Sequence, residues 1–305
     1  MGMELRDIEY FAVVAEHGSI GRAAEALGLS QPALSKSLRR LEASMDAKVV
    51  KRTPKGVELT AVGSALLAQV RRLRLTLSDI SREAADLSQG RAGHLRIGTP
   101  GGFALDLVPT ACGALLKEAP KVTMKITVSD RDASLTGLRT GELDLAITTI
   151  QAPRHEDLGE DYLFDEEFVV YVAANHRLAK RKQLTLADLA QERWATGFIN
   201  GPPERRLSQV FEDSGLPPPN IAIETAFLPI RYHLVAASDL LSFNSRRMVR
   251  YAAARLRIRE LHVKDLAYTR RVGVVYRKDA YLSPAARRFI EILKATAREI
   301  AKEQP

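Results

Sequence analysis

Residues 19–42, SIGRAAEALGLSQPALSKSLRRLE, decide the fold of the N-terminal part of the chain. A serine precedes a helical pattern over Ile20–Leu27, and Gly28 follows it, as expected of an N-cap and of a helix end with positive φ. Ser30 is then suited to cap a second helix that begins at Gln31. Two short helices joined by a tight glycine turn predict a helix-turn-helix unit.

The outer face of the second helix is polar and basic. Leu34 and Leu38 point back to the core, so the opposite face carries Gln31, Ser35, Lys36 and Arg39. We expect the N-terminal residues of this helix to meet base edges in the major groove and its basic residues to meet phosphates. A three-helix packing unit whose charged face is merely solvated is the alternative on spacing alone.

A short basic hairpin follows this helix. Lys48–Arg52 and Val57–Leu59 have the character of two strands around a Thr-Pro-Lys-Gly turn. Residues 36–55 hold seven Lys/Arg against two Asp/Glu, a local excess that favours an anionic partner. We therefore expect a wing that grips the DNA backbone beside the helix.

The same stretch resembles the DNA-binding domain of LysR-type transcriptional regulators. The resemblance runs from Leu5 to about Leu67 and rests on Ala23-Ala24, on SQPALS at 30–35 and on the Leu-Thr-x-x-Gly that starts the next helix. One departure is KVVK at 48–51, where the family usually has a Leu-Phe pair. The resemblance and the spacing together predict a DNA-binding set of Ser30, Gln31, Pro32, Ala33, Ser35, Lys36, Arg39, Arg52, Thr53 and Lys55.

A long amphipathic pattern covers 60–88, with Thr60 as its expected N-cap. Its apolar residues recur at nearly heptad spacing: Val62, Leu66, Val70, Leu73, Leu77, Ile80, Ala84 and Leu87. Such a seam predicts a dimer through paired helices, which would present two recognition helices to one face of DNA. Packing of the seam against the chain's own second domain is the alternative. We expect Arg71, Arg72 and Arg74 to lie on the solvated face.

Strands alternate with helices from His94 onward, which predicts parallel α/β layers. Looser matches at GELDLAI (141–147), HRLA (176–179) and Leu186-x-Asp188-Leu189 resemble the family's effector domain, which implies two α/β lobes like those of a periplasmic binding protein. The expected division is a winged helix-turn-helix domain at 1–59, a linker and dimerisation helix at 60–91 and a regulatory domain at 92–305. Lobe I is expected at about 92–163 and 268–305, and lobe II at about 164–267.

The turn Gly98-Thr99-Pro100-Gly101-Gly102 leaves a strand and opens a helix. Free amides at a helix start favour a carboxylate or phosphate, although a simple connecting turn explains the glycines equally well. Other strand ends match those that line the family's cleft. The predicted effector-binding residues are Thr99, Gly101, Ser129, Thr148, Thr196 and Phe198.

Composition and motifs exclude several classes of protein. The single cysteine, Cys112, excludes an intramolecular disulfide framework, and we expect it to be a buried small residue. No histidine pair has metal-ligand spacing, and no Gly-x-Ser-x-Gly elbow is present. We therefore expect no enzyme, no metal and no cofactor. No 18-residue apolar run or signal peptide is present, so the chain is expected to be cytoplasmic and not membrane-bound.

The sequence thus predicts a DNA-binding regulator whose geometry on DNA is changed by a small anionic effector, with a carboxylate as the candidate chemistry. Its expected partners are double-stranded DNA, the effector and its own copies, as a dimer that pairs into a tetramer; RNA polymerase is a further candidate. A ligand-independent DNA-binding repressor is the main alternative, and a metabolite-binding α/β protein with oligomerising N-terminal helices is a second. The basic tract at 250–288 is expected to be a solvated face rather than a second DNA contact.

Overall fold

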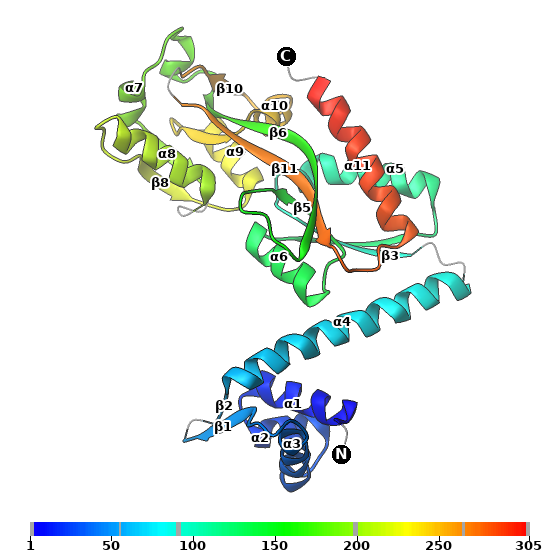
Figure 1. Ribbon diagram of the computed structural model, residues 1–305. Coiled ribbons are helices and arrows are strands. Elements are labelled where there is room, and N and C mark those ends of the chain that lie inside the picture. The colour runs from blue at the N-terminus through cyan, green and yellow to red at the C-terminus, as the bar shows by residue number, and fades with distance from the viewer. Residues whose placement is uncertain (1–2, 55, 90–92, 198–200, 264–265, 303–305) are drawn as a thin grey trace. The chain divides into compact units, whose positions relative to one another are not determined.

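The computed structural model describes residues 3–54, 56–89, 93–197, 201–263 and 266–302 (Figure 1). Contacts along the chain divide it into two compact units, Met1–Ser88 and Gln89–Pro305. We call them the N-terminal unit and the C-terminal unit and describe each by itself.

The N-terminal unit consists of three short helices, a hairpin and one long helix. Their bounds are α1 (Leu5–His17), α2 (Ile20–Leu27), α3 (Gln31–Met45), β1 (Val50–Thr53), β2 (Gly56–Leu59) and α4 (Ala61–Gln89). The predicted caps are present, because Ser19 accepts from Arg22 N at 3.5 Å and Ser30 accepts from Ala33 N at 3.3 Å. Gly28 ends α2 at φ 64°. The helix-turn-helix prediction is therefore confirmed.

The hairpin is fixed by close backbone contacts at both of its ends. Val57 N donates to Gly18 O at 2.9 Å, and a Cβ added to Gly56 would lie 2.3 Å from that same oxygen. A Cβ on Gly63, in the first turn of α4, would lie 1.9 Å from Val49 O. Only glycine allows these approaches, so the wing and α4 are tied to the helical core at two points.

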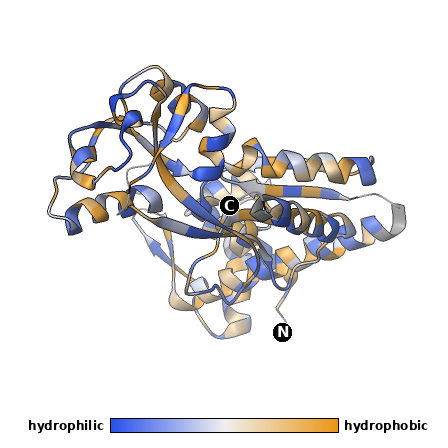
Figure 2. Cartoon of the chain, turned by 90° about the horizontal axis from the view of Figure 1, so that it is seen from above, coloured by the Kyte–Doolittle hydropathy of each residue, from blue (hydrophilic) through white to orange (hydrophobic). Residues whose placement is uncertain are grey.

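The core of the N-terminal unit draws on every helix. Phe11 of α1, Leu34 of α3 and Val49 before β1 are fully buried, and Leu67 and Val70 of α4 pack into the same cluster. Figure 2 shows hydrophobic and hydrophilic residues on the same helices, as expected of helices with one buried face. The first turns of α4 therefore belong to the same packed core as α1–α3 and the hairpin.

A mixed sheet organises the C-terminal unit. Its strand order is β10-β6-β11-β5-β3-β4, with β9 also paired to β6 and a separate pair formed by β7 and β8. The strands are β3 (His94–Thr99), β4 (Thr123–Val128), β5 (Leu145–Thr149), β6 (Leu158–Ala173), β7 (Arg193–Thr196), β8 (Asn220–Glu224), β9 (Ser242–Ser245), β10 (Ile258–Leu261) and β11 (Tyr268–Arg277).

Helices cover this unit between its strands. They are the short 3-10 turns η1 (Phe103–Leu105) and η2 (Arg177–Lys180), and the helices α5 (Leu107–Glu118), α6 (Arg131–Thr140), α7 (Leu186–Ala190), α8 (Pro202–Asp213), α9 (Leu228–Ala236), α10 (Arg246–Ala253) and α11 (Pro284–Lys302).

The prediction of parallel layers is only partly right. Strand β3 runs parallel to β4 and β5, and β7 runs parallel to β8, but β6 pairs antiparallel with β11, β9 and β10. Residues 158–173 form one continuous strand, β6. Two long strands that carry the chain between two lobes in opposite directions must pair antiparallel, which local patterns do not reveal.

Two groups of buried residues mark the two lobes (Figure 1). Lobe I packs α5 and α11 on β3 and β5, with Phe103, Leu107 and Phe289 at its centre. Lobe II packs α8 and its neighbours around Trp194 and Phe211, and a second cluster surrounds Tyr171 and Tyr232. Strands β6 and β11 run side by side between the lobes and contribute to the cores of both.

Candidate DNA interface and effector site

Helix α3 presents most of the predicted DNA-binding residues outward. Gln31, Pro32 and Ala33 in its first turn are exposed, as are Lys36 and Arg39, while Ser35 is half-buried. The N-cap Ser30 is exposed as well. Within the described part of the N-terminal unit, nothing buries this face, so it is free to enter a groove of about the width of a helix.

The inner face of α3 is held by a buried carboxylate. Asp7 of α1 is 1% exposed and accepts from Ser37 Oγ at 2.5 Å and from Arg40 Nε at 2.5 Å. Burial by itself raises the pKa of Asp7, but the hydrogen bonds from Arg40 and Ser37 outweigh it and hold that pKa below its ordinary value. This network, which the sequence did not reveal, fixes the rotation of α3 against α1.

Replacing Asp7 by Asn is expected to lower the free energy of unfolding of the N-terminal unit by about 2 kcal/mol at pH 7, because the guanidinium of Arg40 loses its charged partner. A folded-state pKa below the unfolded one stabilises the fold above the unfolded value, and that contribution disappears as pH falls through the folded value. Thermal unfolding followed by circular dichroism from neutral to acid pH measures both effects.

The control for this variant is Glu25→Gln on the exposed face of α2. It should unfold like the wild type at every pH. An Asp7→Asn protein that is as stable as the wild type at pH 7, or whose deficit does not shrink in acid, would contradict the assignment.

The wing brings one predicted residue against α3. Arg52 is exposed on β1, and its Nη2 lies 3.4 Å from Ser35 Oγ, which links the wing to the recognition helix. Thr53 is half-buried, and its Oγ1 lies 3.4 Å from Gly56 O across the turn. Lys55 lies outside the described residues. The DNA contacts of all these side chains stay predictions.

The apolar seam of α4 is buried at only one of its described positions, since Val62 at its start is 44% exposed and Leu66 is half-buried. Val70 is 2% exposed in the core of the N-terminal unit, whereas Leu73, Leu77 and Ile80 are 37%, 43% and 56% exposed. Thr60 caps the helix as expected, since its Oγ1 accepts from Gly63 N at 2.9 Å. The side chain of Leu87 lies outside the described residues.

The expectation for Arg74 is wrong. Its guanidinium binds Glu9 at 2.7 Å and Glu16 at 2.8 Å, so it fastens α4 to α1 instead of lying on a solvated face. Arg71 and Arg72 are exposed as expected. The sequence at 71–74 did not indicate which of its three arginines faces Glu9 and Glu16 of α1.

Three of the predicted effector residues meet at one edge of lobe I. Thr99 ends β3 and is fully buried, and Ser129 N, just after β4, donates to Thr99 O at 3.1 Å. Thr148 on β5 is also fully buried, and its hydroxyl has no hydrogen-bond partner among the described residues. Because β3, β4 and β5 are parallel, their carboxyl ends gather these hydroxyl groups.

The glycine turn after β3 does not lead directly into a long helix. The turn leads into the three-residue η1, and Phe103 N and Ala104 N both donate to Pro100 O. Helix α5 begins only at Leu107, where the carboxylate of Asp106 already accepts from the first amide. Gly101 is half-buried in this turn, but the amides that follow it have partners.

The edge of lobe II carries Thr196 at the carboxyl end of β7. Thr196 is 3% exposed, and its hydroxyl has no partner among the described residues. Phe198 lies outside the described residues. Sequence reasoning missed Arg231 of α9, which is 7% exposed and lies beside the end of this strand. An arginine in an otherwise apolar helix was the available signal.

A second missed feature joins the lobes. Arg247 of α10 in lobe II donates to Asp106 in lobe I, and its Nη2 lies 3.6 Å from Glu166 of β6. Arg270 of β11 binds Glu166 at 2.6 Å. Burial lowers the pKa of Arg247 to about 10, with a smaller contribution from Arg270. Glu166 is 1% exposed, so this is a buried charge cluster of two cations and two anions.

The basic tract at 250–288 is therefore not one solvated face. Arg270 belongs to the buried cluster, and Arg271 lies over the Tyr162 ring at 5.0 Å. Arg288 on α11 binds Glu118 of α5 at 2.6 Å. The tract is divided among β10, β11 and α11, and its arginines serve different local contacts.

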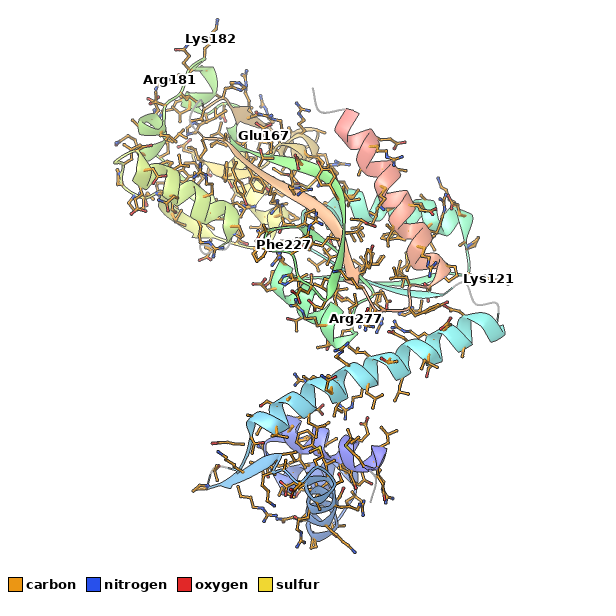
Figure 3. All side chains as sticks on the ribbon, in the orientation of Figure 1. Lys121, Glu167, Arg181, Lys182, Phe227 and Arg277 are labelled. Carbon is orange, nitrogen blue, oxygen red and sulfur yellow. The ribbon has the colours of Figure 1, made fainter. Side chains whose placement is uncertain are left out.

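A cavity of about 600 Å³ lies elsewhere in lobe II, lined by β6, β10 and the 182–185 segment. Its charged rim includes Glu167 and Lys182, both labelled in Figure 3. Arg246 at this rim binds Glu260 at 2.8 Å and also Glu167. The sequence analysis did not indicate this cavity.

The remaining candidate groups show no catalytic or metal-binding arrangement in the described ranges. Cys112 is 8% exposed, and burial raises its pKa to about 11, so the thiolate form is disfavoured. The described residues contain no group of three or more His, Cys, Asp or Glu side chains that could hold a metal ion. None of the described helices combines the length and apolar character that a membrane span requires.

Two family models match the chain, and together they cover nearly all of it. Residues 5–64 match the model described as bacterial regulatory helix-turn-helix protein, lysR family. Residues 88–298 match the LysR substrate binding domain.

Relatives and solved structures agree with these matches. The SDS degradation transcriptional activation protein of Pseudomonas sp. (strain ATCC 19151) is 32% identical over 288 residues, 93% of this chain and 93% of the relative. The HTH-type transcriptional regulator GbpR of Azospirillum brasilense is 28% identical over 97% of this chain and 87% of its own. Full-length CbnR in complex with its target DNA has a similar fold, with a TM-score of 0.62 at 24% identity, over 96% of this chain and 100% of that one.

Proposed function

Because the chain belongs to the LysR family of transcriptional regulators, we propose that it binds specific DNA sites through α3 and the wing and that a small effector in the C-terminal unit changes its geometry on DNA. The family relationship itself makes the chain a DNA-binding regulator with a substrate-binding domain. Its relatives are regulators and not enzymes, and the chain is not an enzyme.

The observation that carries the DNA-binding part is the outer face of α3. Its exposed first turn begins at a capped N-terminus, and Lys36 and Arg39 flank it on the following turns. Polar side chains at this position match base edges, while the cations match phosphates on both sides of the groove. Deletion of residues 1–58 should abolish binding to duplex DNA in a mobility-shift assay, and retained affinity would contradict the proposal.

The exposed seam of α4 supports a dimer. Leu73, Leu77 and Ile80 are large apolar side chains that the N-terminal unit leaves uncovered, and their spacing fits paired helices. A two-fold pair would double the cationic surface and set the distance between the two recognition helices. We propose a dimer of this kind as the DNA-binding form, with pairing of dimers into a tetramer.

Replacing Ile80 by Glu is expected to weaken dimerisation at least tenfold, because each copy would bring a charge into the apolar seam. Sedimentation equilibrium of the full-length protein measures the dissociation constant. The matched control is Ser78→Glu, which adds the same charge on the outer face of the helix. Equal association of the two variants would contradict the paired-helix dimer.

The effector part of the proposal rests on the two polar strand ends. We propose that Thr99, Gly101, Ser129 and Thr148 contact the effector from lobe I, and that Thr196 and Phe198 contact it from lobe II. The buried hydroxyls of Thr148 and Thr196, which have no partner among the described residues, support this assignment because buried polar groups are normally hydrogen-bonded. We propose that the effector is anionic.

A metabolite panel screened by thermal shift, followed by footprints with each ligand that stabilises the protein, tests the effector part. A ligand that both raises the melting temperature and moves the footprint is the expected result. Coupling is limited by the difference between the ligand's affinities for the two conformations. A panel in which stabilising ligands leave the footprint unchanged would favour the ligand-independent repressor.

The functional divisions follow from these roles. We propose a DNA-binding domain at 1–59, a linker and dimerisation helix at 60–91, and a regulatory domain at 92–305 with lobe I at about 92–163 and 268–305 and lobe II at about 164–267. We also propose that the protein acts in the cytoplasm, where its DNA is, and that RNA polymerase at the neighbouring promoter is a further partner.

A further inference from the structure

Arg231 is the most unusual charged side chain in lobe II. It lies on α9, whose outer face carries the exposed residues Phe227 (labelled in Figure 3) and Ile230. Arg231, the residue after Ile230, is by contrast only 7% exposed. Its Nη1 would lie 3.0 Å from a Cβ on Gly197, so the guanidinium lies against the residue that follows β7. The absence of a side chain at Gly197 is what leaves room for it.

The guanidinium is buried without the hydrogen bonds that usually accompany burial. Neither Nε nor Nη1 has an acceptor among the described residues. A buried N–H group that lacks an acceptor destabilises the fold, and the effect is larger for a charged group. The two groups lie on opposite edges of the guanidinium, and Nη1 faces Glu204 at 3.6 Å. The unpaired Nε–H therefore indicates a position for an acceptor that the described polypeptide does not supply.

Further hydrogen-bonding groups converge on the same region. Tyr171 of β6 and Ser242 of β9 are direct neighbours in the antiparallel register, and both hydroxyls are fully buried without a partner among the described residues. Burial raises the pKa of Tyr171, while the nearby Arg231 and Ser242 oppose that rise. The phenol therefore stays a neutral O–H donor near the guanidinium.

Glu204 of α8 limits the charge that this region can accept. Its Oε1 accepts from Gly197 N at 2.9 Å and lies 3.6 Å from Arg231 Nη1, within an ion pair but beyond a hydrogen bond. One cation and one anion are thus already present. A singly charged acceptor would add one net negative charge beside this pair, whereas a doubly charged phosphate would add two and be repelled more strongly by Glu204.

We propose that Arg231 binds the carboxylate group of the effector, with Tyr171 and Ser242 as additional donors. This inference rests on the proposed effector function and specifies its chemistry. One carboxylate oxygen would accept from the unpaired Nε–H. The other would accept from Nη2–H on the same edge of the guanidinium, in paired, charge-assisted hydrogen bonds. Thr196, one residue before Gly197, ends β7, and its buried hydroxyl has no partner among the described residues.

The test uses acetate, which is small enough to enter a carboxylate site whatever the rest of the effector is. The full-length protein is titrated at constant ionic strength with sodium acetate, with neutral acetamide and with inorganic phosphate in parallel. Trp194, the single tryptophan, lies on β7 close to the site and reports binding by its fluorescence, and thermal shift provides a second readout. Millimolar affinity for acetate is expected because the ligand is so small.

The expected result is a saturable response to acetate, none to acetamide and a weaker one to phosphate. Arg231→Met should weaken acetate binding at least tenfold, while Arg206→Met, on the exposed face of α8, should bind as the wild type does. No saturable response of the wild type by either readout, or an equal response in Arg231→Met, would overturn the proposal. Tighter binding of phosphate than of acetate would overturn the assignment to a carboxylate.

The wild-type titration remains decisive even if Arg231→Met does not fold. Failure of this inference is also distinguishable from failure of the proposed function. A metabolite that moves the DNA footprint without any acetate site at Arg231 would leave the regulator model intact. Acetate binding at Arg231 without any ligand that moves the footprint would support the carboxylate site and contradict the proposed effector control of DNA binding.

Discussion

Replacement of Glu166 by Gln is expected to lower the free energy of unfolding of the C-terminal unit by about 3–5 kcal/mol. Glu166 is the central anion of the buried cluster, bound by Arg270 at 2.6 Å and approached by Arg247 at 3.6 Å. The variant keeps the shape of the side chain but leaves an uncompensated positive charge among Phe103, Phe164 and Phe168, which lie under the two guanidinium groups. Thermal unfolding should show a melting temperature lower by about 10 °C.

A surface ion pair provides the control for this experiment. Arg139 binds Asp157 at 2.7 Å, but the two side chains are 40% and 52% exposed. Asp157→Asn should therefore change the free energy of unfolding by less than about 1 kcal/mol. If the two variants lose the same free energy of unfolding, burial does not make the Glu166 cluster more stabilising than a surface ion pair. Its assigned role in joining the lobes would then be wrong.

The second large effect concerns DNA affinity. A triple variant, Lys36→Ala/Arg39→Ala/Arg52→Ala, removes three expected phosphate contacts from each subunit. For a dimer this is six contacts, so the slope of log affinity against log salt should fall in magnitude by about 5. Affinity for every DNA sequence should fall together, because phosphate contacts carry no sequence information. Fluorescence anisotropy at several salt concentrations measures the slope.

The matched control removes the same charge from the C-terminal unit. Arg257, Arg259 and Arg287 are exposed residues of the basic tract at 250–288. Their triple replacement by Ala should leave the salt slope unchanged. An equal fall of the slope in both triple variants would mean that the tract contacts DNA or that net charge alone accounts for the effect.

Local signals were sufficient to predict the DNA-binding unit. Ser19, Gly28 and Ser30 act on the backbone within three residues of themselves, so their caps could be inferred without any knowledge of tertiary structure. Helix α3 begins at Gln31, the residue expected. The same reasoning could not find Asp7, because its partners lie about 30 residues away on another helix.

The connection between the lobes could not be predicted for a related reason. The acidic run at 165–167 lies inside β6, which continues through it. Glu166 points inward and is neutralised by Arg270, which lies directly opposite in the β6–β11 register, while Asp165 and Glu167 point outward. A buried charge inside a strand is tolerated when an opposite charge pairs with it. The partner of Glu166 lies 104 residues away in the sequence, so local patterns could not identify it.

The polar edge of lobe I, which we propose contacts the effector, was predicted in part. The rule that ligands lie at the carboxyl ends of parallel strands placed Thr99, Ser129 and Thr148 together, and the structure brings these three residues to one edge. The rule does not apply to side chains from helices such as Arg231. Its burial beside Gly197 depends on the packing of α9 against β7, which sequence periodicity does not specify.

The central claim is that the helix beginning at Gln31 enters the major groove of DNA and that a dimer presents it twice. Methylation interference at guanine N7, which lies in the major groove, tests this most directly when the wild type is compared with Gln31→Ala. The account predicts two patches of interference separated by whole turns of the duplex, with contacts in both patches weakened by the variant. A single patch, or interference that is the same for both proteins, would contradict it.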